Sequence, residues 1–197
     1  MNIFFTSDTH FFHSAIIKYC PDSRSQFNDA EEMNEFLVNQ WNDKVNPNDT
    51  VYHLGDVGFA RPEILSGVLR RLNGQIILVP GNHDHKLIKK HDFVYCFENI
   101  ICSSYFELKI GDDFVTLCHY PIARWNRMYY NQIHLHGHCH GSYAYHVNAL
   151  DVGVDVKPNH DMAPWEWQEI KDYVANRDPA NLLTRNVDVD SMLKPEM

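Results

Sequence analysis

The chain has 197 residues, of which 44% are hydrophobic and 22% charged, so one domain with a well-packed core is expected. Its net charge of −9 argues against binding long duplex nucleic acid, which requires many Lys and Arg to displace counterions. No apolar run approaches the ~18 residues of a membrane span, and the opening MNIFFTSD lacks the basic start of a signal peptide, which favours the cytoplasm.

The first half of the chain alternates short apolar runs with amphipathic segments. Strands are expected at residues 3–6, 51–54 and 75–79, where the runs are short and apolar. A helix over residues 28–44 has Asn28 or Asp29 as its cap, and a second helix opens at Pro62 and ends at Gly74. This βαβ order indicates a layered α/β domain.

The second half favours strands linked by hairpins. Residues 105–110 and 114–118 predict a hairpin around Gly111, further strands are expected at 132–135 and 147–156, and a last helix at 164–176. The predicted domain therefore covers residues 1–176, and the polar, aperiodic residues 177–197 predict a loosely held tail. Two mixed sheets flanked by helices and a single open sheet both fit this pattern.

Five of the apolar runs end just before residues that commonly bind metal ions. Strand ends lie along one edge of an α/β sheet, so side chains remote in sequence can converge there. Glycines at positions 55, 81 and 137 allow the backbone to turn sharply or to approach an ion closely. In chain order, the candidates are Asp8 and His10, Asp56, Asn82 with His83 and Asp84, His119, and His138 with His140.

The chemistry of these side chains indicates the class of metal. The sequence has 13 His and only five Cys, with no CxxC pair, so oxygen and imidazole ligands for Mn, Fe, Zn, Ni or Mg are expected rather than a thiolate zinc site. Seven ligands are too many for one ion but suffice for two ions if one carboxylate bridges them. If Asp8-Thr9-His10 and His138-Cys139-His140 are extended, each pair of ligands points the same way.

These motifs resemble those of the calcineurin-like metallophosphoesterase family over residues 1 to about 160. The matching pieces are Asp8-Thr9-His10, Gly55-Asp56, Gly81-Asn82-His83-Asp84, His119 and Gly137-His138-Cys139-His140. The segments TSDTHFFH and CHYPIARWN are similar to those of small bacterial and phage members without a capping domain. The resemblance implies a fairly open site and the family's four-layer sandwich, with two mixed β-sheets flanked by helices.

The resemblance also implies a role for each matching residue. One divalent metal ion would be held by Asp8, His10 and His140, a second by Asn82, His119 and His138, and Asp56 would bridge both. A hydroxide bridging the two ions would attack phosphorus. His83, oriented by Asp84, would stabilise or protonate the leaving oxygen.

Other residues admit more than one interpretation. His13 could bind substrate, support the metal ligands or start a helix. Arg124 is expected to pair with phosphate, whereas Trp125 could stack on a base or anchor its loop. A structural or solvent-exposed role is expected for Arg24, Arg61, His53, His134, His146, Asp151 and Asp155.

Three functions remain open. The first is a phosphoesterase that acts on a small phosphomonoester or phosphodiester, and the second is a nuclease or cyclic-nucleotide phosphodiesterase that uses the same site. The third is a metal-binding interaction module that has lost catalysis; it is disfavoured because every position of the motifs is filled. The expected partner is a small phosphate ester, possibly a nucleotide, and the sequence indicates no oligomeric state.

Overall fold

The computed structural model of the protein describes residues 1–178 and residue 182, and it contains two mixed β-sheets. The two-sheet alternative is therefore confirmed, and the single open sheet is excluded. The first sheet has the order β4-β3-β2-β1-β9, with β1 at Ile3–Thr6, β2 at Thr50–His53, β3 at Gln75–Leu78, β4 at Asn99–Ile100 and β9 at Trp165–Glu166. The second has the order β5-β6-β7-β8, with β5 at Phe106–Ile110, β6 at Asp113–Leu117, β7 at Ile133–His136 and β8 at Ala149–Asp151.

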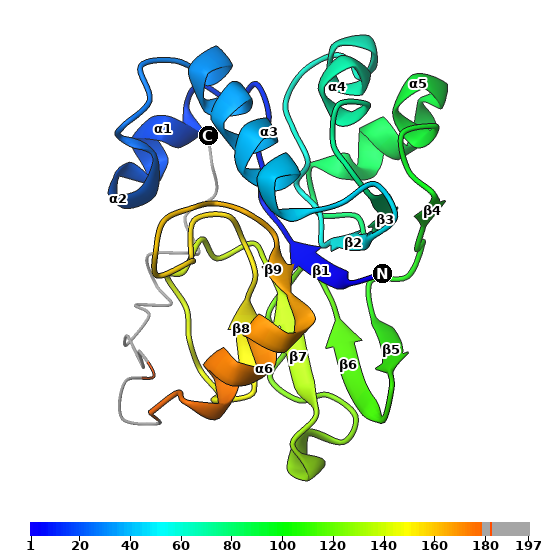
Figure 1. Ribbon diagram of the computed structural model, residues 1–197, viewed down its shortest axis with the longest axis vertical. Coiled ribbons are helices and arrows are strands. Elements are labelled where there is room, and N and C mark those ends of the chain that lie inside the picture. Colours follow the sequence, from blue (N-terminus) through cyan, green and yellow to red (C-terminus); the bar gives the residue numbers. More distant parts are fainter. Residues whose placement is uncertain (179–181, 183–197) are drawn as a thin grey trace, which may run out of the picture.

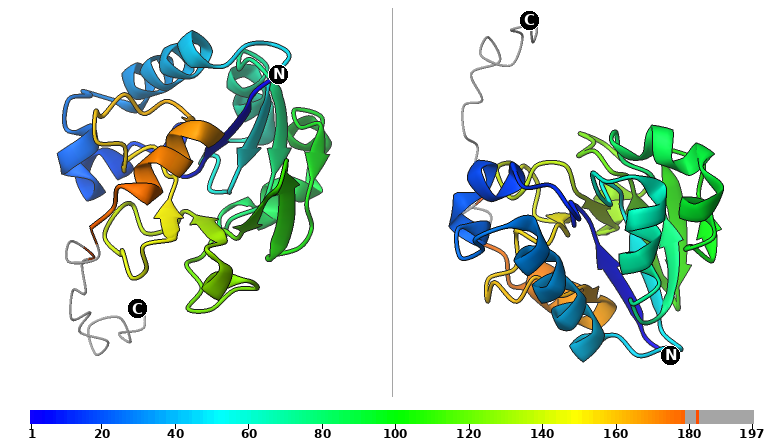
Figure 2. Two further views of the ribbon diagram at one scale, coloured as in Figure 1. Left: turned by 60° about the horizontal axis from the view of Figure 1, so that its bottom comes forward. Right: turned by 90° about the horizontal axis from the view of Figure 1, so that it is seen from above.

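Helices flank these sheets. Figures 1 and 2 show α3, α4 and α5 over one side of the first sheet, with the second sheet on its other side. No helix in the described part of the chain is long and apolar enough to cross a membrane. The helices are α1 (Ile16–Tyr19), α2 (Pro21–Arg24), α3 (Ala30–Lys44), α4 (Pro62–Leu69), α5 (His91–Val94) and α6 (Trp167–Ala175), with 3₁₀ turns η1 (Asp84–Lys89) and η2 (Met128–Tyr130).

The strand directions bring the expected ligands toward one edge of the molecule. In the first sheet β1, β2 and β3 run parallel, and in the second sheet β6, β7 and β8 run parallel. An isolated parallel bridge between Ser7 and Gly153 joins the segments that follow β1 and β8. The ends of strands from both sheets therefore lie close to one another.

The first sheet packs against a core on each face, which explains why β1 and β3 are mostly apolar. Neighbouring residues of a strand point to opposite faces, so Phe4 and Val51 contact the core under the helices, while Phe5 and Tyr52 contact the core between the sheets. The second core also contains Leu117 and, from α6, several apolar side chains. The two cores hold β1 and β2 rigidly beneath the site.

Three expected elements differ from the structure. The helix expected from Pro62 to Gly74 ends at Leu69. The predicted strand over 147–156 is only β8, because Asp151 Oδ1 accepts a hydrogen bond from Gly153 N at 2.8 Å and turns the backbone there. The predicted helix over 164–176 begins at Trp167, since Trp165 and Glu166 pair with β1. The predicted tail lies outside the described residues except for residues 177, 178 and 182.

Candidate metal centre

The expected ligands come together at the ends of five strands. Asp8 and His10 follow β1, Asp56 follows β2, Asn82 follows β3, His119 follows β6, and His138 and His140 follow β7. Two groups of three have ligand atoms that all lie within 4.8 Å of one another: Asp8, His10 and His140, and Asp56, His119 and His138.

The first group contains buried polar atoms without a hydrogen-bond partner. Asp8 Oδ1 and His10 Nε2 lie 3.9 Å apart, and neither has a partner among the described residues. Burial raises the pKa of Asp8 to about 8 and lowers that of His10 to about 2. Because a buried acceptor without a partner costs free energy, this group fits a bound cation, which would accept both lone pairs.

In the second group, two hydrogen-bond acceptors face each other without a proton between them. His119 Nδ1 lies 2.7 Å from Leu54 O and donates to it, so Nε2 of the neutral ring carries the lone pair. That nitrogen lies 3.0 Å from Asn82 Oδ1, which is also an acceptor. Two acceptors that face each other are stabilised by a cation between them. Asn82 therefore fits the ligand set of this group.

The carboxylate of Asp56, a member of the second group, also lies close to the first group. Its Oδ2 is 3.8 Å from His10 Nε2 and 3.6 Å from His119 Nε2. Ligand atoms that share an ion about 2.1 Å from each are separated by roughly 3–4 Å. Asp56 therefore lies within reach of an ion in either group, which suits the bridging role implied for it.

The backbone at the ligands is strained. Five of the expected ligands have φ between 46° and 70°, in the left-handed region that residues other than Gly rarely adopt. They are Asp8, His10, Asp56, His138 and His140. The expectation of extended Asp-Thr-His and His-Cys-His segments is therefore wrong. The ligands converge through tight left-handed turns, and strain of this kind concentrates at functional sites.

Comparison with known proteins agrees with this geometry. The profile of the Calcineurin-like phosphoesterase superfamily domain matches residues 1–153. The chain belongs to this superfamily. The family resemblance seen in the motifs is thus confirmed.

Individual relatives of this calcineurin-like chain carry little functional information. An uncharacterized protein of Methanocaldococcus jannaschii is 43% identical over 84 residues, which cover 42% of this chain and only 46% of that protein. Gene 66 protein of Mycobacterium phage L5 is 28% identical over 185 residues, which cover 78% of this chain and 86% of that protein. The crystal structure of a protein of unknown function from Aquifex aeolicus has a TM-score of 0.65 at 24% identity, covering 87% of this chain and 98% of that one, and shares the fold.

His83 and Asp84 of the calcineurin-like motif have separate surroundings. The His83 side chain is 46% exposed, and its Nε2 lies 3.9 Å from Asp56 Oδ2. Asp84 is fully buried and accepts hydrogen bonds from the backbone N–H groups of Asp56 (2.8 Å), Val57 (3.1 Å) and Gly81 (2.8 Å). The expectation that Asp84 orients His83 is therefore corrected: Asp84 ties together the two loops that follow β2 and β3.

A buried ion pair supports the first group of ligands. Asp155 Oδ2 lies 2.7 Å from His140 Nδ1, and Arg24 donates to both oxygens of Asp155 at 2.7 Å each. Arg24 also donates to the backbone oxygen of Asp8 at 2.7 Å. The solvent-exposed position expected for Arg24 is thus wrong, because its side chain is fully buried.

The pKa shifts of Asp155 and His140 agree with a role of Asp155 in orienting the His140 ring. Burial disfavours the charged form of Asp155, but hydrogen bonds from Arg24 and His140 hold its pKa below the usual range. Burial also disfavours the charged ring of His140, yet its hydrogen bonds to Asp155 and Cys20 raise its pKa to about 11. A carboxylate on the outer nitrogen of a ligating His fixes the ring and increases its basicity.

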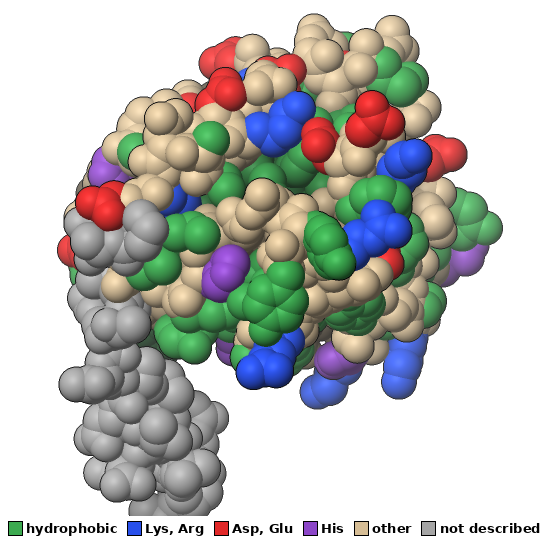
Figure 3. All heavy atoms as spheres, turned by 90° about the horizontal axis from the view of Figure 1, so that it is seen from below, with side chains coloured by type: hydrophobic (Ala, Val, Ile, Leu, Met, Phe, Trp, Pro, Cys, Tyr) green, Lys and Arg blue, Asp and Glu red, His purple; other side chains and the backbone are tan. Residues whose placement is uncertain are grey.

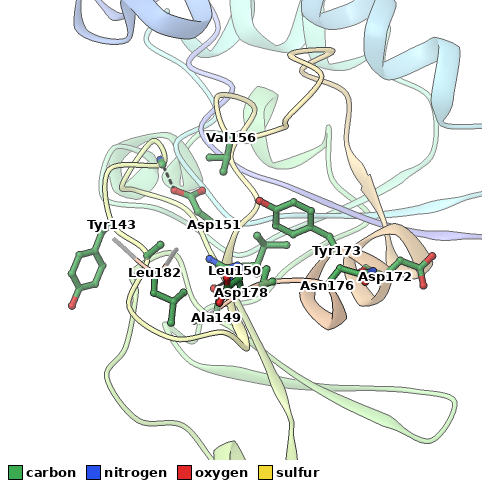
Figure 4. A pocket seen from close by; sticks show the side chains of 13 residues that line it. Tyr143, Ala149, Leu150, Asp151, Val156, Asp172, Tyr173, Asn176, Asp178 and Leu182 are labelled. Atoms are coloured by element: carbon green, nitrogen blue, oxygen red, sulfur yellow. Dashed lines mark hydrogen bonds between the residues drawn. The ribbon is translucent and has the colours of Figure 1, made fainter. Parts of the chain in front are cut away.

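Asp151 holds the loop that carries His138 and His140. Its Oδ2 accepts a hydrogen bond from Gly141 N at 3.0 Å, drawn as a dashed line in Figure 4. The structural role expected for Asp151 is consistent with this contact. A hollow of about 680 Å³ lies beside Asp151 and Tyr173, and none of the expected metal ligands line it. Figure 4 shows the side chains that line this hollow.

The expected substrate-binding residues fall in different places. His13 Nδ1 lies 3.0 Å from His10 Nδ1, so His13 is at the site. Arg124 is exposed and is not among the residues that line the groove at the ligands. Trp125 is buried and donates to Gln132 O at 2.9 Å, so its ring anchors the loop and is not free to stack on a base.

Two aromatic residues, Phe59 and Tyr120, lie at the site and were not predicted from the sequence. Phe59 stacks on His10 with ring centroids 5.1 Å apart, and Tyr120 lies 4.7 Å from the ring of His138. The only available signal was position, because Phe59 follows Asp56 by three residues and Tyr120 directly follows His119. Aromatic residues at such positions pack in a core in most proteins, and the sequence alone does not distinguish the two cases.

Proposed function

We propose that the protein is a metal-dependent phosphoesterase that hydrolyses a small phosphomonoester or phosphodiester with two divalent ions. The observation that carries the proposal is the pair of buried atoms Asp8 Oδ1 and His10 Nε2, which lack hydrogen-bond partners and lie beside the carboxylate of Asp56. Asp8, His10 and His140 would hold one ion, Asn82, His119 and His138 the other, and Asp56 both. Mn, Fe, Zn, Ni and Mg all suit these oxygen and nitrogen ligands.

Two divalent ions, when bound, supply a water of lowered pKa and neutralise charge on the phosphate oxygens. The other roles belong to side chains of the protein. Half-exposed His83, beside Asp56, stabilises or protonates the leaving oxygen. Asp155 orients the ring of His140, and Asp84 fixes the backbone of Asp56 and Gly81.

The size and charge of the surface favour a small substrate. A groove of about 980 Å³ passes His10, His83, His138 and His140, which is enough for a nucleotide-sized ester. On the face drawn in Figure 3, Lys and Arg side chains are scattered among hydrophobic and acidic ones instead of forming a basic stripe. With a net charge of −9, a long duplex is a poor partner.

A cyclic-nucleotide phosphodiesterase or a nuclease for short single strands remains the alternative with the same residues. Comparing turnover of 2′,3′-cyclic nucleotides, mononucleotides and short oligonucleotides separates these substrates. A non-catalytic metal-binding module is disfavoured, because all seven ligand positions and His83 are filled.

The Asp56→Asn variant tests the proposal. Losing the carboxylate that both groups share should lower kcat/KM of the Mn-reconstituted protein by roughly 100-fold or more toward bis(p-nitrophenyl) phosphate or p-nitrophenyl phosphate. Asp112→Asn, the same change on the exposed β5–β6 turn, is the matched control and should keep wild-type activity. Wild-type turnover by Asp56→Asn, or no metal-dependent hydrolysis of any ester by the wild-type protein, would refute the proposal.

A further inference from the structure

An exposed aromatic surface lies directly against the candidate metal centre. Phe59 is 38% exposed, and its ring centroid lies 4.0 Å from that of His13, 5.1 Å from His10 and 4.6 Å from His83. Tyr19, 73% exposed, extends this surface on the far side of His13, with centroids 6.3 Å apart. We call the rings of Tyr19, His13 and Phe59 the aromatic wall.

The position of Phe59 in the wall is rigid. Its backbone N donates to Phe11 O at 2.8 Å, and Phe11 N donates to Val57 O at 2.9 Å. The preceding Gly58 leaves no room for a side chain, since an added Cβ would lie 2.5 Å from Leu65 and 2.8 Å from Phe11 O. A ring held in place before binding loses little conformational entropy when a ligand stacks on it.

The chemistry of the groove indicates what the wall binds. Among the described residues that line it there is no Lys or Arg, so no ammonium or guanidinium group is available to pair with a second phosphate. Its carboxylates are Asp22 and Asp155, and Asp155 is already paired with Arg24. An exposed aromatic surface with no Lys or Arg among the described residues beside it favours an uncharged group with a flat face.

We propose that the aromatic wall binds a flat, uncharged aromatic group carried by the phosphate ester, packed on the exposed part of the Phe59 ring that the stacked rings of His13 and His10 leave uncovered, next to the leaving oxygen. The proposal rests on the proposed function for the position of the phosphate. It adds a class of substrate, aromatic esters, and a specificity-determining residue, Phe59. His83 contacts both Phe59 and the space beside Asp56, so the aromatic group and the scissile bond can be adjacent.

Two matched pairs of ligands test the proposal with the Mn-loaded protein in isothermal titration calorimetry. Adenosine 5′-monophosphate carries a base where ribose 5-phosphate carries a hydroxyl group, and phenyl phosphate and cyclohexyl phosphate differ in the flatness of the ring. Stacking of a base on an aromatic side chain corresponds to an affinity ratio on the order of 10 to 100. We expect a ratio of at least about 10 for one pair, and the pair that shows it identifies a base or an aryl group as the natural source.

Variants of Phe59 show whether this ring causes the preference. The affinity ratio should fall to about one in Phe59→Ala, take an intermediate value in Phe59→Leu, which keeps an apolar side chain, and remain in Phe59→Tyr. Tyr129→Leu removes a ring that is 81% exposed on η2, outside the groove, and should keep the wild-type ratio.

Equal affinities within both pairs, or a ratio that persists in Phe59→Ala, would overturn the proposal. Hydrolysis of bis(p-nitrophenyl) phosphate is followed in parallel. Hydrolysis without an affinity ratio contradicts the aromatic wall alone, whereas an affinity ratio without any hydrolysis contradicts the proposed function alone.

Discussion

Asp155 pairs with both Arg24 and His140, although it is not one of the expected ligands. Its carboxylate, 2% exposed, is shared between the buried guanidinium of Arg24 and the ring of His140. Arg24 in turn contacts the backbone of Asp8, so a single ion pair positions two ligands that come from different sheets. We interpret Asp155 and Arg24 as positioning residues for the first group of ligands.

Replacing Asp155 with Asn should lower both the affinity for metal ions and the free energy of unfolding. The change keeps the shape of the side chain but removes the negative charge between Arg24 and His140. Loss of a partner that orients a ligand typically lowers metal affinity about 10–100-fold, and removing one partner of a buried ion pair costs about 3–5 kcal/mol. Titration with Mn²⁺ and urea unfolding measure the two effects, and unchanged values of both would show that the ion pair has no positioning role.

At the residue scale, the convergence of the seven expected ligands could be predicted because each follows a short apolar strand and belongs to a specific motif. The positions of Arg24, Trp125 and Asp84 could not be predicted, because each depends on what the side chain contacts in three dimensions. A charged residue in a short polar segment is exposed in most proteins. The burial of Arg24 depends on Asp155, 131 residues away in the sequence, and on backbone acceptors such as the oxygen of Asp8.

At the element scale, the loops after the strands approach one another too closely for ordinary side chains. An added Cβ at Gly137 would lie 2.0 Å from Ser7 Oγ and 2.4 Å from Asp8 Oδ2. The loop after β7 therefore packs directly on the loop after β1. By contrast, a Cβ added at Gly67, within α4, would have no atom within 4 Å apart from its chain neighbours and the backbone of its own helix.

These two glycines predict opposite effects of the same substitution. Gly137→Ala should displace Asp8, lower stability by about 1–3 kcal/mol through overpacking and weaken Mn²⁺ binding. Gly67→Ala, a matched control, should raise stability by about 0.5–1 kcal/mol, since Ala favours a helix more than Gly does. Thermal unfolding measures both, and a Gly137→Ala variant as stable as the wild type that binds metal normally would contradict the close packing.

The elements themselves were predictable to different degrees. The strands before the ligands and the cap of α3 follow from local patterns, and Asp29 does accept a hydrogen bond from Glu32 N at 2.8 Å. The residues after β8 have the apolar alternation of a strand, but Val152 and Val154 are buried in a turn region that Asp151 holds. Alternation reports burial, and burial in a turn produces the same pattern as burial in a strand.

At the scale of the whole molecule, two sheets are needed to make the site. The first sheet supplies Asp8, His10, Asp56 and Asn82, and the second supplies His119, His138 and His140. The periodicity of the sequence is compatible with one sheet or with two, because pairing between distant strands has no local signature. The family resemblance indicated two, and the observed strand order confirms it.

The central claim is that these seven side chains hold two metal ions with Asp56 between them. Anomalous diffraction from a crystal grown with Mn²⁺ tests it most directly. We predict two peaks about 3.5–4 Å apart, one beside Asp8, His10 and His140 and the other beside Asn82, His119 and His138, both next to Asp56. A single peak, or a peak held instead by Cys20, His140 and Asp155, which also lie close enough to bind an ion, would contradict the account.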